Sequence, residues 1–387
     1  IFIIETMTDL LEMKAALLAC KEQTDLPIFA TMTFEENGRT FLGTSPEVAA
    51  LALSALGANV VGINCSLGPA ALAPLVRTML AYAPCPVMLQ ANAGLPSMVD
   101  GRTVYSISPA SYVGAVEPLI EAGVTVVGGC CGTDPDYIAL ERAALERHPV
   151  PERAVERHTA LTSAQNAVVL HGSEVGVIGE RINPTGKKDL QAELQAGEYG
   201  LAMRFASEQV ALGAPILDVN VGAPMVDEAL LLPELVQRLT GKYAEPLSLD
   251  SSHAEAIAAA LPFCPGSPLV NSISGEADRM EHLGPLCRQW GAPFILLPIQ
   301  GRKLPVKAAD RIAIIENMLD KAAMLGIPRR LVLVDVLALA VASKAEAARE
   351  GLETIRWCAA HGLATTIGLS NISFGLPARE LVNTTFL

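Results

Sequence analysis

Aromatic residues and basic clusters are both scarce in this sequence. Only 4% of its 387 residues are Phe, Trp or Tyr, whereas 51% are hydrophobic, with Ala, Leu and Val prominent. This composition favours parallel strands buried on both faces beneath helices. The formal net charge is −13, and no cluster of Lys and Arg lies on a predicted helix face. Both features argue against nucleic acid or an anionic membrane as a partner.

Long apolar runs and secretory signals are also missing. No apolar stretch reaches the roughly 18 residues of a transmembrane helix, and the first residues carry neither a basic region nor a cleavage site. Eight cysteines without a secretory segment favour a reduced, cytoplasmic protein over a disulfide framework. Because the sequence opens at Ile1 with a strand-like run and no Met, we expect it to be part of a longer protein.

Short apolar strands alternate with helical stretches along the chain, which predicts parallel sheets or barrels. Helix starts are marked by Ser45-Pro46-Glu47 and by Ser108-Pro109, each a cap followed by a first-turn proline. The first series of expected strands is 1–5, 27–33, 60–64, 86–91 and 124–128. The second series is 175–179, 216–220, 246–250, 269–272, 293–298, 331–335 and 364–369.

The strand count sets the predicted fold class. A closed (β/α)8 barrel has eight strands and about 250 residues, so two barrels would exceed this chain by about a hundred residues. We therefore predict an α/β protein with two TIM-type barrels, the first (1–149) lacking its opening units and the second (173–387) its closing unit. The polar segment 150–172 is expected to be a linker with some helix. Two open sheets are the less favoured alternative.

Three cysteines stand at the ends of two expected strands. Cys65 follows strand 60–64, and Cys130 and Cys131 follow strand 124–128. Strand ends of a parallel barrel converge on one rim, so three thiols can meet there. Three protein ligands leave one position of a zinc ion open, and a substrate thiol held there becomes a nucleophilic thiolate. The alternative is that they are small buried hydrophobes, but adjacent cysteines among glycines favour a metal. The other five cysteines are interpreted as structural.

Polar side chains recur at the strand ends of the second series. Each alone could be a loop residue or a helix cap, but a ring of carboxylates and amides suits a flat, donor-rich heterocycle. No glycine-rich phosphate loop accompanies them. The residues concerned are Glu180, Arg181, Asn183, Asp218, Asn220, Asp250, Asn271, Asp335 and Asn371.

With these motifs in order, the whole chain resembles the N-terminal part of the cobalamin-dependent methionine synthase family. Segments 64–69 (NCSLGP) and 128–133 (GGCCGT) match the zinc motifs of that family, and 179–186 (GERINPTG) matches the opening of its pterin-binding barrel. The resemblance implies a homocysteine barrel joined to a methyltetrahydrofolate barrel, which together transfer a methyl group from 5-methyltetrahydrofolate through cobalamin to zinc-bound homocysteine.

The resemblance also implies individual roles. Zinc would be held by Cys65, Cys130 and Cys131, and the amino-acid end of homocysteine by Glu5 and Asn92. Asn371 would contact N5 of the folate as the catalytic residue. The remaining pterin contacts would be Glu180, Asn183, Asp250, Asn271, Asp335 and Arg379.

Nothing in the sequence matches a cobalamin-binding domain, since no Asp-x-His-x-x-Gly motif is present. We expect cobalamin to be carried by a domain of the same longer protein, outside this chain. Three other readings stay open: a cobalamin-independent thiol methyltransferase, a non-catalytic folate-binding module, and, less favoured, a dihydropteroate synthase.

Overall fold

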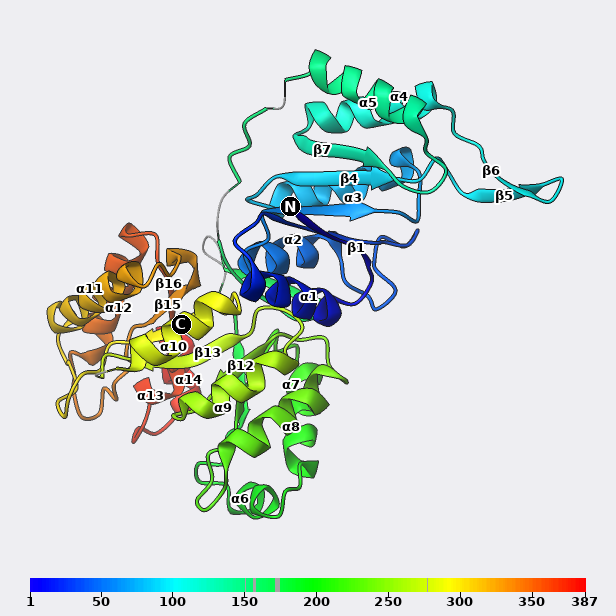
Figure 1. Ribbon diagram of the computed structural model, residues 1–387. Helices are drawn as coiled ribbons and strands as arrows, with labels where there is room; N and C mark the ends of the chain where they lie inside the picture. Colours follow the sequence, from blue (N-terminus) through cyan, green and yellow to red (C-terminus); the bar gives the residue numbers. More distant parts are fainter. Residues whose placement is uncertain (150, 156–157, 171–174, 277) are drawn as a thin grey trace.

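Two parallel sheets, each covered by helices, make up this protein in a computed structural model (Figure 1). The structure describes residues 1–149, 151–155, 158–170, 175–276 and 278–387. The first sheet has the order β1-β2-β3-β4-β7 and all its strands are parallel. Its strands are β1 (Phe2–Met7), β2 (Ile28–Met32), β3 (Val60–Asn64), β4 (Val87–Ala91) and β7 (Val124–Gly129).

Helices follow these strands in the predicted rhythm. They are α1 (Leu10–Gln23), α2 (Pro46–Ala55), α3 (Pro69–Tyr82), α4 (Pro109–Glu121) and α5 (Pro135–Arg147). The predicted caps are confirmed, because the hydroxyl oxygens of Ser45 and Ser108 accept hydrogen bonds from the amides of Val48 and Ser111. A hairpin of β5 (Pro96–Val99) and β6 (Arg102–Tyr105) interrupts the rhythm and projects from the body of the molecule (Figure 1).

The second sheet contains seven parallel strands in sequential order, β10 to β16. They are β10 (Ile178–Ile182), β11 (Ile216–Asn220), β12 (Leu247–Asp250), β13 (Leu269–Ser274), β14 (Phe294–Leu297), β15 (Val332–Asp335) and β16 (Ala364–Thr366). The longer helices around it are α6 (Lys188–Gln195), α7 (Gly200–Ala211), α8 (Glu228–Thr240), α9 (Ala254–Ala260), α10 (Arg279–Gln289), α11 (Ala308–Met324) and α12 (Ala347–Ala360). Two short 3-10 turns and the helices α13 (Leu369–Ile372) and α14 (Arg379–Phe386) complete it.

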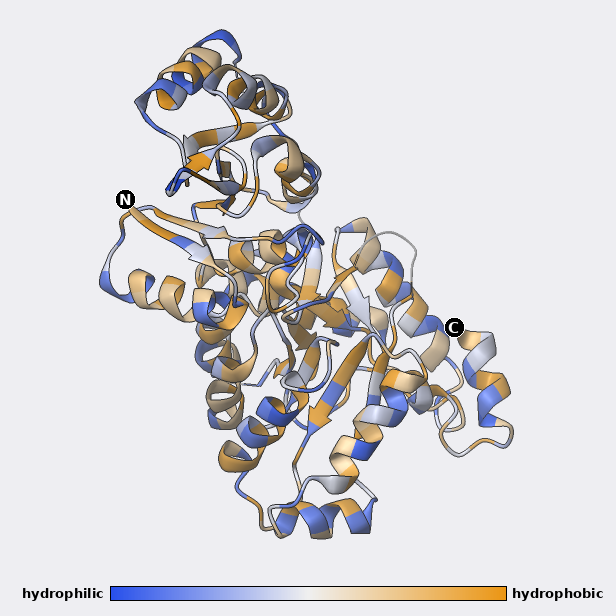
Figure 2. Ribbon diagram, turned by 90° about the vertical axis from the view of Figure 1, so that its right-hand side faces the viewer, coloured by the Kyte–Doolittle hydropathy of each residue, from blue (hydrophilic) through white to orange (hydrophobic). Residues whose placement is uncertain are grey.

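The predicted fold class is confirmed: five and seven parallel strands in chain order are partial barrels of the TIM type. Most strand ends lie within two residues of expectation, and two strands differ by three residues. The strand expected at 175–179 lies at Ile178–Ile182, so Glu180 and Arg181 are within it, and β16 ends at Thr366. Figure 2 shows the central strands as predominantly hydrophobic and the outer helix faces as mixed, as burial on both sheet faces requires.

The segment expected to be a linker with some helix contains a hairpin instead. Strands β8 (Thr159–Thr162) and β9 (Ala167–Leu170) pair antiparallel, whereas positions 150, 156–157 and 171–172 lie outside the described residues. Leu161 of this hairpin is fully buried and packs against the first or second residues of four strands, namely Ile216, Leu269, Ile295 and Leu333. We call residues 159–170 the floor hairpin, since it covers the N-terminal end of the second sheet.

The floor hairpin also contacts the first sheet's domain. The Thr44 hydroxyl donates to the carbonyl of Ala164 at 2.7 Å, and the Gln165 amide donates to the carbonyl of Leu42 at 3.1 Å. Nearby, the buried Lys14 ammonium of α1 donates to the carbonyl of Cys264 at 2.7 Å. The helical side of the first sheet therefore lies against the N-terminal end of the second.

No helix in the described part of the chain is both long and apolar enough to cross a lipid bilayer.

Candidate functional site

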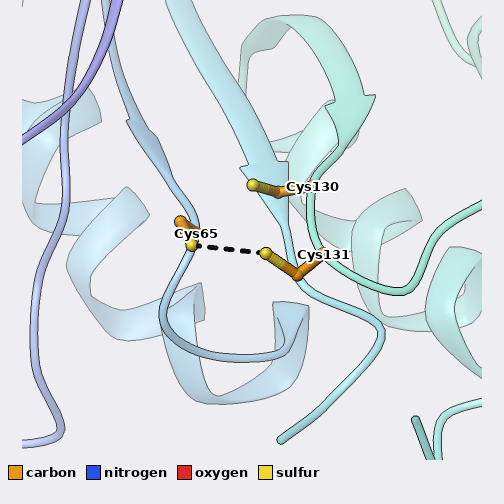
Figure 3. A group of neighbouring side chains, drawn as sticks. All are labelled: Cys65, Cys130 and Cys131. Carbon is orange, nitrogen blue, oxygen red and sulfur yellow. Dashed lines mark hydrogen bonds between the residues drawn. The ribbon is translucent and has the colours of Figure 1, made fainter. Parts of the chain in front are cut away.

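Three cysteine thiols converge at the carboxyl end of the first sheet (Figure 3). The sulfur atoms of Cys65, Cys130 and Cys131 all lie within 4.8 Å of one another, and those of Cys65 and Cys131 are 3.8 Å apart. Cys65 comes from the end of β3, while Cys130 and Cys131 come from the end of β7. Within the described residues, this is the only such group of His, Cys, Asp or Glu side chains.

The backbone after β3 turns sharply to aim the first thiol. Cys65 and Ser66 both adopt left-handed conformations, with φ of 63° and 62°. Few non-glycine residues do so, and such residues concentrate at functional sites. The amide of Cys65 donates to the carbonyl of Gln90 on β4 at 2.9 Å, so the turn remains tied to the sheet.

Asn92 joins the two cysteine loops. Its side-chain oxygen accepts from the amide of Cys131 at 3.1 Å, and its side-chain nitrogen donates to the carbonyl of Ser66 at 3.2 Å. The residue is only 4% exposed. Asn92 therefore fixes the separation of the loops that carry the thiols, whereas the sequence pointed only to a contact with substrate.

Glycines allow the second loop to pass close to its neighbours. A Cβ atom at Gly129 would lie 2.1 Å from the Thr133 hydroxyl, which donates to the carbonyl of Cys130 at 2.7 Å. Gly132 has a φ of +82°, and its Cβ would lie 2.2 Å from the ring of Tyr105. Side chains at these two positions would displace the cysteine loop.

The sulfur arrangement fits a zinc ion. A tetrahedral ion with Zn–S bonds of 2.3 Å places its sulfur ligands about 3.8 Å apart, close to the separation of Cys65 and Cys131. Burial, and then the neighbouring Cys65, raises the pKa of the Cys130 thiol to about 12. A divalent cation would reverse this, because it deprotonates thiols that coordinate it. Three thiols leave one coordination position for another ligand.

Two further polar residues belong to the same sheet: Glu5, which the sequence predicted as a site residue, and Asn64, which it did not. Glu5 lies exposed on β1, an edge strand of the sheet. Asn64, which precedes Cys65, is fully buried and ties β1 to β3, since its side-chain oxygen accepts from the amide of Thr6 at 2.9 Å. Sequence reasoning gave Asn64 no role of its own. Its signal was a lone polar residue ending an apolar run.

Carboxylates and amides gather at the carboxyl end of the second sheet. Asp218, Asn220, Asp250 and Asn271 come from the neighbouring strands β11, β12 and β13. The Asn220 side-chain nitrogen donates to the Asp250 carboxylate at 2.8 Å. Burial raises the pKa of Asp250, and Glu180 and Glu228 add to the rise, while the hydrogen bond from Asn220 opposes it. These four residues of the predicted rim therefore form a connected polar cluster on this side of the sheet.

Asp335 ends β15 on the far side of β14. Its carboxylate accepts from the amide of Leu337 at 2.8 Å, and burial raises its pKa. Arg311, fully buried in α11, donates to the carbonyl of Val336 at 2.8 Å and so holds the loop that follows Asp335.

The remaining predicted residues border this rim. Asn183 follows β10 and donates to the Glu180 carboxylate at 3.2 Å. Asn371 is exposed on the short helix α13 after β16. Arg379 begins α14 and donates to the carbonyl of Ser370 at 2.8 Å, next to Asn371. These side chains lie on loops and helices that follow the strands, outside the connected cluster around Asp250.

Comparison with known families matches each half of the chain to a different model. Residues 1–145 match the model "Homocysteine S-methyltransferase", and residues 179–385 match "Pterin binding enzyme". The chain thus belongs to the pterin binding enzyme family, with a homocysteine S-methyltransferase region ahead of the pterin-binding part. The boundary between the two matches falls on the segment that contains the floor hairpin.

Curated relatives combine both halves. The methionine synthase of Mycobacterium tuberculosis is 32% identical over 406 residues, and that of Mycobacterium leprae is 31% identical over 417. Each match covers 100% of this chain and 34% of the relative. The chain therefore spans about a third of the length of these methionine synthases.

Two solved structures each align with somewhat more than half of this chain. The dihydropteroate synthase from Vibrio fischeri is 19% identical, with a TM-score of 0.42, over 58% of this chain and 85% of that one. A second, titled "Crystal Structure of Dihydropteroate synthetase with Product1", is 19% identical, with a TM-score of 0.44, over 59% and 87%.

Proposed function

We propose that this chain is the substrate-binding part of a methionine synthase that moves a methyl group from 5-methyltetrahydrofolate, through cobalamin, to homocysteine. The observation that carries the proposal is the pairing of two unlike sites in one chain. Three thiols end one parallel sheet, and a cluster of carboxylates and amides ends the other. The two methionine synthase relatives align with both halves.

In the first site, Cys65, Cys130 and Cys131 would hold zinc, which when bound supplies the positive charge that keeps a substrate thiol ionised near neutral pH. Asn92 holds the two loops at a fixed separation. Glu5 would pair with the ammonium group of homocysteine, since it is an exposed carboxylate on the strand that Asn64 ties to β3.

In the second site, the pterin would lie against Asp250, Asn271 and Asp335. Carboxylates accept paired N–H bonds from an aminopyrimidinone edge, and buried acceptors discriminate strongly against ligands that leave them unpaired. Glu180, Asn183 and Arg379 would complete the rim. Asn371 would contact N5, where a hydrogen bond assists departure of the methyl group.

The methyl group would need a carrier between the two sites. The floor hairpin covers the N-terminal end of the second sheet on the side of the first domain, so the pterin rim opens away from the thiols. A pterin held at one rim could not reach a thiolate at the other. Cobalamin on a domain of the longer protein is the proposed carrier, and movement of such a domain belongs to the microsecond-to-millisecond range or slower.

The test uses the full-length protein with methyltetrahydrofolate and homocysteine, with methionine as the measured product. We expect essentially no methionine without a corrinoid and sustained formation once reduced cobalamin is supplied. A Cys131→Ser variant serves as the matched control and should stay inactive in both conditions. Methionine formed at the same rate without any corrinoid would support a cobalamin-independent thiol methyltransferase instead.

A further inference from the structure

Asp218 is a buried carboxyl group behind the pterin rim. The proposed function assigns it no role. It sits in the middle of β11 and is only 2% exposed. Its Oδ1 atom accepts from the Ser248 hydroxyl at 2.6 Å and from the Asn271 side-chain nitrogen at 3.2 Å. Its Oδ2 atom is buried and has no hydrogen-bond partner among the described residues.

The charged groups that act on Asp218 are themselves acidic. Asp250 lies within hydrogen-bonding reach on the neighbouring strand β12, and Glu180 acts from β10 on the other side. Beyond Asp250 stand Glu228 of α8 and, 3.7 Å from it, the ring of His253 before α9. Burial, and then Asp250, raises the pKa of Asp218 to about 7. An anion buried among anions is costly, and a bound proton removes that cost.

We propose that Asp218 is a positioning residue that shares a proton with Asp250 and so fixes the Asn271 amide with its oxygen toward the pterin. The proton resides on Asp218 Oδ2, and this O–H group donates a hydrogen bond to the Asp250 carboxylate. No bond to the substrate forms or breaks in this arrangement. The inference deepens the proposed function, because it takes the pterin as the ligand of this rim.

The orientation of two amides follows from the shared proton. Asn271 commits its nitrogen to Asp218, and Asn220 commits its nitrogen to Asp250. The Asn271 oxygen and the remaining Asp250 lone pairs then face the ligand as acceptors. The rim is thereby specific for a ligand edge that donates N–H groups. Loss of the proton would place two carboxylates side by side, and their repulsion would disturb both amides.

Two substitutions of Asp218 distinguish the effect of its proton on ligand affinity from the effect of its side-chain packing. Asp218→Asn keeps an acceptor for Ser248 and supplies a permanent N–H donor toward Asp250, so it imitates the protonated carboxyl. Asp218→Ala removes both. Asp227→Asn is the matched control, because it makes the same chemical change at an exposed helix cap of the same barrel, where Asn and Asp cap equally well.

Affinity of the full-length protein for methyltetrahydrofolate is measured by titration one pH unit below and one above the Asp218 pKa of about 7. We expect the wild type and Asp227→Asn to bind up to about tenfold more weakly at the higher pH, because the protonated fraction of Asp218 falls about tenfold between the two pH values. Asp218→Asn should bind like wild type at the lower pH and keep that affinity at the higher one. Asp218→Ala should be weak at both, provided that it folds by circular dichroism.

A ligand-free measurement separates this inference from the proposed function. At the lower pH, the difference spectrum of wild type minus Asp218→Asn should contain the infrared band of one protonated carboxylic acid. Glu141, whose pKa is also raised to about 7, contributes equally to both proteins and cancels. If that band is present but methyltetrahydrofolate does not bind, the proposed function fails and the shared proton stands. If the band is equal in both proteins, or Asp218→Asn binds as poorly as Asp218→Ala, the inference is overturned.

Discussion

At the scale of single residues, the thiol site depends on side chains that would not themselves touch an ion. Asn92 spans the two cysteine loops, and Gly129 and Gly132 admit Thr133 and Tyr105 at distances that no Cβ could tolerate. The sequence predicted the three ligands because cysteines at parallel strand ends must meet at one rim. It could not predict the bridge made by Asn92, because both of its partners are backbone groups of distant loops.

Cys130→Ser is expected to remove most of the zinc from the full-length protein, since two thiols and a hydroxyl bind zinc far more weakly than three thiolates. The wild type should carry about one zinc per site. Metal content is measured after dialysis by atomic emission. Cys20→Ser, a cysteine of α1 outside the cluster, is the matched control and should retain the metal. Equal zinc in wild type and Cys130→Ser would refute the assignment.

Asp250→Asn and Asp335→Asn should each weaken methyltetrahydrofolate binding by about 1–3 kcal/mol, because each replaces an acceptor with a donor opposite a ligand N–H. Equilibrium titration measures this, with Asp227→Asn as the control for an exposed carboxyl. Unchanged binding in both variants would place the pterin elsewhere.

Asn371 is predicted to act on the methyl-transfer step rather than on pterin binding. Asn371→Ala should slow methyl transfer more than it weakens binding, if its contact strengthens only as the methyl group leaves. Single-turnover kinetics beside the titration separates the two effects. An equal loss in both would mean that Asn371 only binds the pterin.

Glu141 of α5 offers a prediction about stability. The residue is 2% exposed, neither carboxylate oxygen has a partner among the described residues, and burial raises its pKa to about 7 from 4.5. Between those values the folded state keeps a proton that the unfolded state has lost. Stability therefore falls as the pH rises through this range, and the loss is complete above about 7.

Glu141→Gln lacks this proton and should escape the loss. We expect its melting temperature, relative to that of the wild type, to rise between pH 4.5 and 7 and to level off above. Thermal unfolding of residues 1–387 across this pH range measures the difference. Glu146→Gln, on the exposed side of the same helix, should show no such trend. A constant difference for Glu141→Gln would contradict the raised pKa.

At the scale of helices and strands, runs of β-branched residues and capped helix starts predicted most of the two sheets, because both signals are local. The hairpins were missed, since their support is not local: Leu161 packs against residues of strands far along the chain, such as Ile216 of β11 and Leu333 of β15. The start of β10 was misplaced for a related reason. Val175 and Val177 have strand-like character but are 65% and 57% exposed, and pairing with β11 begins only at Ile178.

The floor hairpin should stabilise the second barrel through Leu161. Leu161→Ala removes a fully buried side chain and is expected to cost about 2–5 kcal/mol, as large-to-small substitutions in cores do. Urea unfolding followed by circular dichroism measures the change. Leu230→Ala, the same substitution at a position 65% exposed on α8, should change stability by less than about 0.5 kcal/mol. Similar losses in both would show that the hairpin is no part of the core.

At the scale of the whole molecule, the two domains meet through buried polar contacts as well as through the floor hairpin. The Lys14 ammonium donates to the carbonyls of Cys264 and Gly266 and lies 4.9 Å from the centre of the Trp290 ring. Burial lowers the pKa of this lysine to about 8. Sequence alone predicted two domains and a connecting segment. Their mutual orientation depends on single contacts between distant positions, which no local pattern contains.

The floor hairpin at the N-terminal end of the second barrel also constrains how a methyl carrier moves between the two candidate sites. On the proposed function, the methyl carrier cannot pass through the barrel and must travel around its outer wall, attached by a connecting segment of the longer protein. A flexible tether reaches only about 5–6 Å times the square root of its number of residues, so doubling its reach takes four times its length. The reach of the tether rather than ligand affinity would then limit turnover. Shortening the tether would prevent the carrier from reaching one site before it prevented access to the other.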